Sequence, residues 1–222
     1  MDQINLDLFK ESANGDFARI CALIAKGADV NYANGDGRTA LMRAAKRNYL
    51  DIVKKLLEAK ANVRARDFNN KTALMGAAKK GNLEVVKELI KAGSDVNSFD
   101  NQKRTSLMRA ALLGHIDVVK YLVENGANID AQDNKGRTAL MEAVNAFKVE
   151  VIHYLLEKGA NINMQDYEGC TSLMRASYGG YVDLVVFLLN KGADKEILDN
   201  ESRKAIHYVR SECLDELKDI LK

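Results

Sequence analysis

Five methionines recur at a fixed spacing of 33 residues, and thioether sulfurs can bind soft metal ions. They are Met42, Met75, Met108, Met141 and Met174. If they occupy equivalent places on stacked helices, neighbouring sulfurs lie roughly 8–10 Å apart, which is too far for two of them to share an ion. Methionine is also an adaptable filler of apolar interiors. We therefore expect these side chains to pack in the core, and we predict no metal site.

Nucleophilic catalysis would need a histidine beside a cysteine, a serine or a pair of carboxylates. The three histidines, His115, His153 and His207, fall at different positions within the 33-residue spacing. His115 follows a turn glycine, and His153 is predicted on an outer helix surface. The sequence has no H-x-x-x-H pair and no glycine-rich phosphate loop. We therefore predict a chain that is not an enzyme, with no catalytic residue and no cofactor.

The three cysteines, Cys21, Cys170 and Cys213, show neither disulfide-framework nor metal-type spacing. We expect Cys170 to be exposed at a loop tip, where a lone thiol is usually incidental. The first residues, Met1 to Asn5, carry an acid rather than the basic start of a secretory signal. No apolar run approaches the roughly 18 residues that span a bilayer. We predict a cytoplasmic protein without a membrane segment, with delivery into a host cell as the open alternative.

The methionines belong to a longer motif, Thr-Ala/Ser-Leu-Met, which begins at Thr39 and returns every 33 residues. A fixed period of this length predicts a solenoid of identical helical units. In the unit at 36–68, Thr39 is a predicted N-cap and helices are predicted at about 40–47 and 50–59. Glycine ends the second helix in other copies, but Lys60 stands there in this unit. A left-handed conformation at Lys60 would cost on the order of 1 kcal/mol. We therefore predict that the 61–70 loop has low local stability.

The combined pattern resembles the ankyrin repeat over nearly the whole chain: T-[AS]-L-M-x-A-[AS], a glycine turn, V-V-x-x-L-L and G-A-[DN]-[VI]-N. The resemblance implies an all-α solenoid of stacked antiparallel helix pairs with projecting hairpin loops. It predicts a single domain over 1–222, with an N-terminal cap at 3–35, repeats at 36–68, 69–101, 102–134, 135–167 and 168–200, and a C-terminal cap at 201–222. The chain departs from the family in having no proline and in carrying methionine in place of histidine.

In ankyrin repeats, partners usually dock on the hairpin tips and on the concave face of the first helices. Carried over to this sequence, those positions give a predicted partner-binding surface. It comprises Arg38, Arg43, Lys46, Arg47, Arg66, Phe68, Lys71, Lys79, Lys80, Phe99, Arg104, Arg109, Leu112, Leu113 and Tyr178. Its charge changes along the chain, because 36–70 holds nine Lys/Arg against four Asp/Glu, whereas 170–202 holds three against five.

We therefore predict a monomeric protein-interaction module that binds an acidic segment of a protein partner of unknown identity. The basic residues would speed encounter, and Leu112 and Leu113 would supply an apolar anchor. One alternative is nucleic acid or another polyanion bound by the basic N-terminal half. The nearly balanced net charge of +2, and aromatics that do not alternate with basic residues, weigh against nucleic acid. The other alternative is an inert spacer or scaffold.

Overall fold

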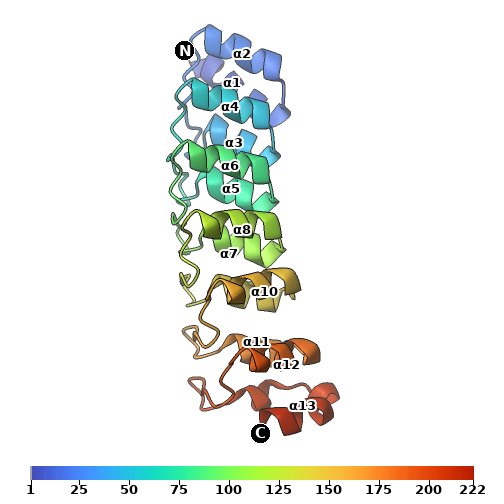
Figure 1. The fold of residues 1–222 in the computed structure, drawn as a ribbon. Coiled ribbons are helices and arrows are strands. Elements are labelled where there is room, and N and C mark those ends of the chain that lie inside the picture. Colours follow the sequence, from blue (N-terminus) through green and yellow to red (C-terminus); the bar gives the residue numbers. More distant parts are fainter. Residues whose placement is uncertain (1) are drawn as a thin grey trace.

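The computed structural model describes residues 2–222 as an elongated stack of helix pairs (Figure 1). The termini lie at opposite ends of the stack, and the connecting loops line one edge. The first, or inner, helices are α1 (Asp2–Asn14), α3 (Ala40–Arg47), α5 (Ala73–Lys80), α7 (Ser106–Leu113), α9 (Ala139–Asn145) and α11 (Ser172–Gly179). The second, or outer, helices are α2 (Phe17–Ala25), α4 (Leu50–Glu58), α6 (Leu83–Lys91), α8 (Ile116–Glu124), α10 (Val149–Glu157) and α12 (Val182–Asn190). The 3-10 helices η1 (Ala205–Tyr208) and η2 (Ser211–Cys213) and helix α13 (Leu214–Leu221) follow.

The inner helices from α3 to α11 each begin at a threonine that caps the helix. The Thr39 hydroxyl accepts a hydrogen bond from the Met42 N–H at 3.4 Å, as predicted, and the same bond recurs at each of the four later copies. One such bond is worth about 1 kcal/mol to a helix. The buried alanines that follow let neighbouring inner helices approach closely. The cap therefore sets where each inner helix starts and which face it turns to the core.

The methionines of the motif pack in the interior, as expected. Met75, Met108, Met141 and Met174 are at most 1% exposed, and Met42, near the start of the stack, is partly buried. The outer helix α4 buries Ile52, Val53 and Leu56 against the same core and ends one residue earlier than predicted. The core is therefore a continuous apolar layer between the inner and outer helices rather than a single central cluster.

Helix α4 ends at Glu58, and Lys60 in the turn that follows has a left-handed backbone with φ +66°. The glycines at the equivalent positions of other pairs also have positive φ, for example Gly27 at +85° and Gly93 at +93°. The prediction that Lys60 adopts the left-handed conformation is confirmed. The structure shows the backbone conformation of Lys60, while the low local stability of the 61–70 loop stays a prediction.

The hairpin loops are joined into a ladder by one backbone hydrogen bond per step. The Phe68 N–H donates to the Asp36 carbonyl at 3.0 Å, and the equivalent bonds of the four following loops measure 2.9–3.1 Å. Asn34 holds the turn of the first loop, and a buried aspartate takes that place in each of the five later loops. In the second loop, for instance, Asp67 Oδ1 accepts the N–H groups of Asn69 and Lys71 at 2.9 Å each. The loops therefore form an ordered wall along one edge of the stack (Figure 1), and the candidate site lies in the corner between this wall and the inner helices.

Candidate binding site on the inner helices

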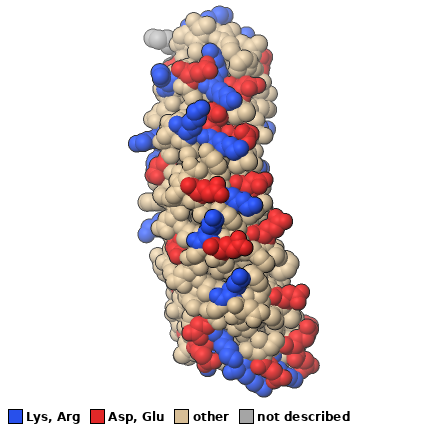
Figure 2. Space-filling model, viewed as in Figure 1, with Lys and Arg blue, Asp and Glu red and all other residues tan. Residues whose placement is uncertain are grey.

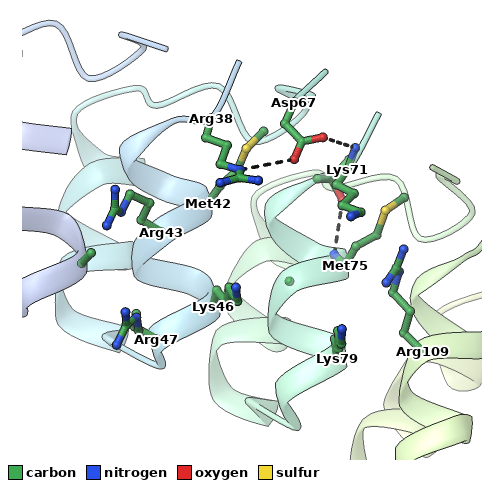
Figure 3. Close-up of a pocket in the computed structure, with 13 residues that line it drawn as sticks. Arg38, Met42, Arg43, Lys46, Arg47, Asp67, Lys71, Met75, Lys79 and Arg109 are labelled. Atoms are coloured by element: carbon green, nitrogen blue, oxygen red, sulfur yellow. Dashed lines mark hydrogen bonds and ion pairs between the residues drawn. The ribbon is translucent and has the colours of Figure 1, made fainter. Parts of the chain in front are cut away.

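A pocket of about 310 Å³ opens between α3 and α5, at the corner where the hairpin loops meet the inner helices (Figure 3). Met42 and Met75 come from the helices, whereas Arg38, Asp67 and Lys71 come from the loops. The full lining comprises Ala13, Arg38, Met42, Arg43, Lys46, Arg47, Asp67, Lys71, Thr72, Met75, Gly76, Lys79 and Arg109. The pocket thus gathers seven of the predicted binding residues, all of them basic.

Gly76 occupies a position at which the equivalent residues of the other inner helices have long side chains: Arg43, Arg109, Glu142 and Arg175. A Cβ atom at Gly76 would lie 3.6 Å from Lys46 Cβ, which is an ordinary contact, and its φ is not in the left-handed region. The backbone therefore does not require glycine here. The missing side chain leaves open space in the pocket. Sequence reasoning missed this residue, although the comparison of the five copies carried the signal.

The cations of the pocket have few carboxylates to neutralise them. Asp67 is the acidic residue among the lining. It lies 3.8 Å from Arg38 Nε, and Arg38 Nη1 also lies 3.3 Å from Asp36. Within residues 2–222, Lys46, Lys71 and Lys79 form no ion pair. The pocket is therefore a region of concentrated positive charge.

The pKa values of two pocket residues are lowered, first by burial and next by the neighbouring cations. Burial, and next the neighbouring Arg47 and Arg38, lower the pKa of Arg43. Burial, and next Arg109 and three neighbouring lysines, lower the pKa of Lys79. Each added proton is opposed by the positive charges already present. A bound anion would relieve this repulsion.

Further along the stack, the inner-face arginines are held by carboxylates of the chain itself. Arg109 pairs with the buried Asp100. Arg104 Nη2 lies 3.1 Å from Glu142 Oε2, and Arg137 Nη1 lies 4.0 Å from Glu142 Oε1. The predicted binding residues Arg104 and Arg109 are thus neutralised, because buried acids lie beside them. Uncompensated positive charge is concentrated on α3, α5 and their loops.

The hairpin residues of the predicted surface form a separate group at the loop tips. Arg66 donates from Nη1 to the Phe99 carbonyl at 3.1 Å and from Nη2 to Ser98 Oγ at 3.0 Å, which joins two neighbouring hairpins. Phe68 is 74% exposed and Phe99 is 49% exposed. These three residues do not line the pocket. They form an apolar and basic edge beside it.

The last residues of α3, α5 and α7 are Arg47, Lys80 and Leu113, which occupy equivalent positions and are all exposed. This row changes from basic to apolar along the stack. Leu112 was expected to be exposed beside Leu113, but it is partly buried, so Leu113 is the more accessible of the two. Tyr178, on α11, is 64% exposed.

Phe147 extends the apolar surface and was missed in the sequence. It stands in the turn after α9, where three of the other repeats have glycine and one has Asn48, and its φ is +50°. Its ring is 47% exposed, and its centroid lies 4.5 Å from that of Tyr181. A bulky residue in the left-handed region is uncommon. The signal that could have found it in the sequence is a phenylalanine at a position where most other copies have glycine. The inner face therefore continues from Leu113 towards an aromatic region.

Cys170 does not lie exposed at its hairpin tip, and the prediction that it would be exposed is wrong. It is 8% exposed, because Tyr208 from η1 covers it with the phenol oxygen 3.2 Å from Sγ. Burial raises the pKa of the Cys170 thiol, which disfavours the nucleophilic thiolate. The carboxylate of the nearby Asp166 accepts hydrogen bonds from Arg175 and from the Cys170 N–H. These groups hold the hairpin together.

The histidines also make structural contacts. His115 Nε2 lies 3.1 Å from the Lys79 carbonyl, which links two neighbouring helix pairs. His153 is exposed on α10 and stacks on Phe187 with a centroid distance of 4.1 Å. His207 Nδ1 accepts the N–H of Lys204 at 2.9 Å. Each histidine is therefore engaged in a different local contact.

Comparisons with known proteins agree with this architecture. A family model for ankyrin repeats matches residues 8–100, 64–133 and 107–199. The structure is similar to the crystal structure of the human ASB11 ankyrin repeat domain, with a TM-score of 0.88, 22% sequence identity and 97% coverage of both chains. A 65-residue stretch is 37% identical to the probable E3 ubiquitin-protein ligase XBOS33 of Oryza sativa subsp. japonica, covering 29% of this chain and 12% of that protein. Among residues 2–222, no helix is long and apolar enough to cross a membrane.

Proposed function

The chain belongs to the ankyrin-repeat family, whose repeats are a general protein–protein interaction module, and from this premise we propose that it binds an acidic segment of a partner protein along its inner face. The segment would lie over α3, α5 and α7, with its acidic residues at the pocket and an apolar residue at Leu113. The family's fold typically serves as a non-enzymatic scaffold. We propose that this chain likewise acts by binding.

The observation that carries this proposal is the contrast between the two halves of the inner face. Among residues 2–222, Lys46, Lys71 and Lys79 of the pocket lack carboxylate partners, whereas Arg104 and Arg175 further along the stack are paired within the chain. Burial, and next the neighbouring cations, lower the pKa of Lys79, so the pocket disfavours its charged form. Solubility alone does not account for cations placed at such a site. Complementary charge on a partner would relieve that repulsion and steer the encounter.

A polyanion such as nucleic acid is the second candidate, and the same crowding of cations is what favours it. On the face seen in Figure 2, however, basic and acidic side chains are interspersed along the stack. A nucleic acid follows a long basic track, and its affinity falls steeply with salt because counterions are released. The basic region here is confined to a corner and continues into the apolar Leu113. These features support a protein segment over a polyanion.

A charge-reversal experiment tests the proposal. The triple variant Arg43→Glu, Arg47→Glu and Lys80→Glu should lose partners captured from the native cells of this protein. The matched control reverses Lys54, Lys91 and Lys120, which are exposed on the outer helices, and should retain them.

Two further measurements separate the alternatives. Binding that survives high salt but is lost in Leu113→Asp supports the protein segment, whereas a steep loss with salt and no effect of Leu113→Asp supports a polyanion. If the inner-face triple variant retains every partner, the proposed surface is wrong, and if the wild-type chain captures nothing specific, the spacer alternative is favoured.

A further inference from the structure

The pocket at Gly76 holds more positive charge than a carboxylate side chain would neutralise. Seven Lys or Arg side chains line it, and the neighbouring Asp36, Asp67 and Asp100 offset three of these charges, which leaves four. An aspartate or glutamate of a partner brings one negative charge. A phosphorylated side chain brings about −1.5 to −2 near pH 7, together with three acceptor oxygens. The excess charge therefore matches a phosphoryl group better than a carboxylate.

The chemistry of the lining points the same way. Guanidinium groups bind phosphate oxygens in pairs, and lysines act as point charges. Arg47 offers such a group without a carboxylate partner among residues 2–222, and Lys46, Lys71 and Lys79 surround the pocket (Figure 3). The Arg43 guanidinium lies 4.5 Å from the centroid of the Phe9 ring, and Arg38 contacts Asp36 and Asp67. The same neighbours that crowd Arg43 and Lys79 would become partners of a bound dianion. Gly76 supplies the room, because a side chain such as that of Arg109 would fill this space.

We infer that the pocket at Gly76 receives a phosphoryl group on a side chain of the segment that binds the inner face, an inference that rests on the proposed function. The pocket lies in the corner between the hairpin loops and the inner helices, and residues from both walls line it. A narrow peptide side chain can enter such a corner, whereas a flat bilayer surface reaches it poorly. A phosphorylated peptide is therefore the occupant that the geometry favours over a lipid headgroup.

The repeat geometry also sets the distance from this group to the apolar anchor. Leu113 follows Gly76 by one 33-residue step and four further helical residues. The step between neighbouring helices is about 8–10 Å, and four helical residues rise about 6 Å, so the two points lie about 10–12 Å apart. An extended peptide rises about 3.3 Å per residue. The partner segment should therefore carry a large apolar residue three or four residues from the phosphorylated one.

A synthetic peptide series tests both parts of the inference. Each peptide carries one phosphoserine and one leucine, placed one to eight residues apart on either side in a Gly/Ser/Asp background, and binding is followed by fluorescence anisotropy. We expect the tightest binding at a separation of three or four residues. Replacing the phosphoserine of that peptide by glutamate should weaken binding at least tenfold, and replacing it by serine should weaken it further.

Two variants locate the phosphoryl group. Gly76→Gln fills the pocket without changing its charge, and it should fold well because glutamine has a higher helix propensity than glycine and its Cβ has room. It should abolish the preference for phosphoserine over glutamate. Lys46→Gln with Lys79→Gln should weaken the phosphopeptide at least tenfold, whereas the matched pair Lys54→Gln with Lys91→Gln on the outer helices should leave it unchanged.

The outcomes separate the two proposals. Equal binding of the phosphoserine and glutamate peptides, or an undiminished preference in Gly76→Gln, overturns the phosphoryl site and leaves the acidic-segment proposal standing. Binding to vesicles that contain 5% phosphatidylinositol 4,5-bisphosphate, without binding to any peptide of the series, overturns it in favour of a lipid headgroup. Peptide binding that is unaffected by reversing Arg43, Arg47 and Lys80 contradicts the proposed function itself.

Discussion

Replacing Lys60 by glycine should stabilise the protein, and the repeat supplies the reason and the control. Lys60 has φ +66° at the position where other helix pairs have glycine. A left-handed conformation costs a residue with a side chain about 1–2 kcal/mol, while the extra freedom of glycine in the unfolded chain offsets about 0.5–1 kcal/mol of any gain. The expected net stabilisation is about 0.5–1 kcal/mol, or roughly 1–4 °C in melting temperature for a chain of this size.

The structure isolates this effect from packing. At the equivalent glycines, such as Gly93 and Gly126, an added Cβ would meet nothing within 4 Å, so the change acts through the backbone alone. Urea titrations of wild type, Lys60→Gly and the reverse substitution Gly93→Lys would measure it. The two variants should shift the unfolding midpoint by similar amounts in opposite directions. If Lys60→Gly is neutral or destabilising, or if Gly93→Lys has no effect, the strain argument is wrong.

Three further predictions concern the caps and the C-terminal end. Burial raises the pKa of Asp199, but hydrogen bonds from Tyr208, Arg203 and the backbone outweigh it and hold that pKa well below its usual range. Asp199→Asn should therefore lower the melting temperature at pH 7, and the difference should shrink as the pH falls below about 4; a constant difference would contradict this. Cys170 should react with iodoacetamide at pH 8 far more slowly in the folded than in the urea-unfolded chain, as mass spectrometry would show, and equal rates would refute its burial. Thr105→Ala should cost about 1 kcal/mol in urea unfolding through loss of its cap bond, whereas no loss would remove that role.

Much of the fold could be predicted because it depends on local patterns that repeat. The cap at Thr39, the burial of the motif methionines and the conformation of Lys60 each follow from a residue's place within one 33-residue unit. Because the unit occurs five times, a helix boundary or cap that is unclear in one copy is indicated by the others. The 33-residue spacing therefore predicted a helical solenoid, and the resemblance to the ankyrin repeat predicted how its helix pairs stack.

The features that could not be predicted depend on contacts between units or on the end of the array. Cys170 is buried because Tyr208 reaches it from the irregular C-terminal segment, which the repeat pattern does not describe. The charge of Arg104 is neutralised by Glu142 of the next unit. The other units have arginine or glycine at the position of Glu142. The pocket depends on the absence of a side chain at Gly76. Its position and lining depend on how neighbouring units pack, which the pattern within one unit does not describe.

A lysine footprint of the bound complex is the most direct test of the central claim. Lys46, Lys79 and Lys80 are exposed on the inner helices, and Lys54 and Lys91 are exposed on the outer helices. Acetylation of each lysine would be followed by mass spectrometry, with and without a captured partner or the tightest peptide. The partner should slow acetylation of the three inner lysines and leave the two outer ones unchanged. Equal rates at the inner lysines, or protection confined to Lys54 and Lys91, would contradict binding at the inner face.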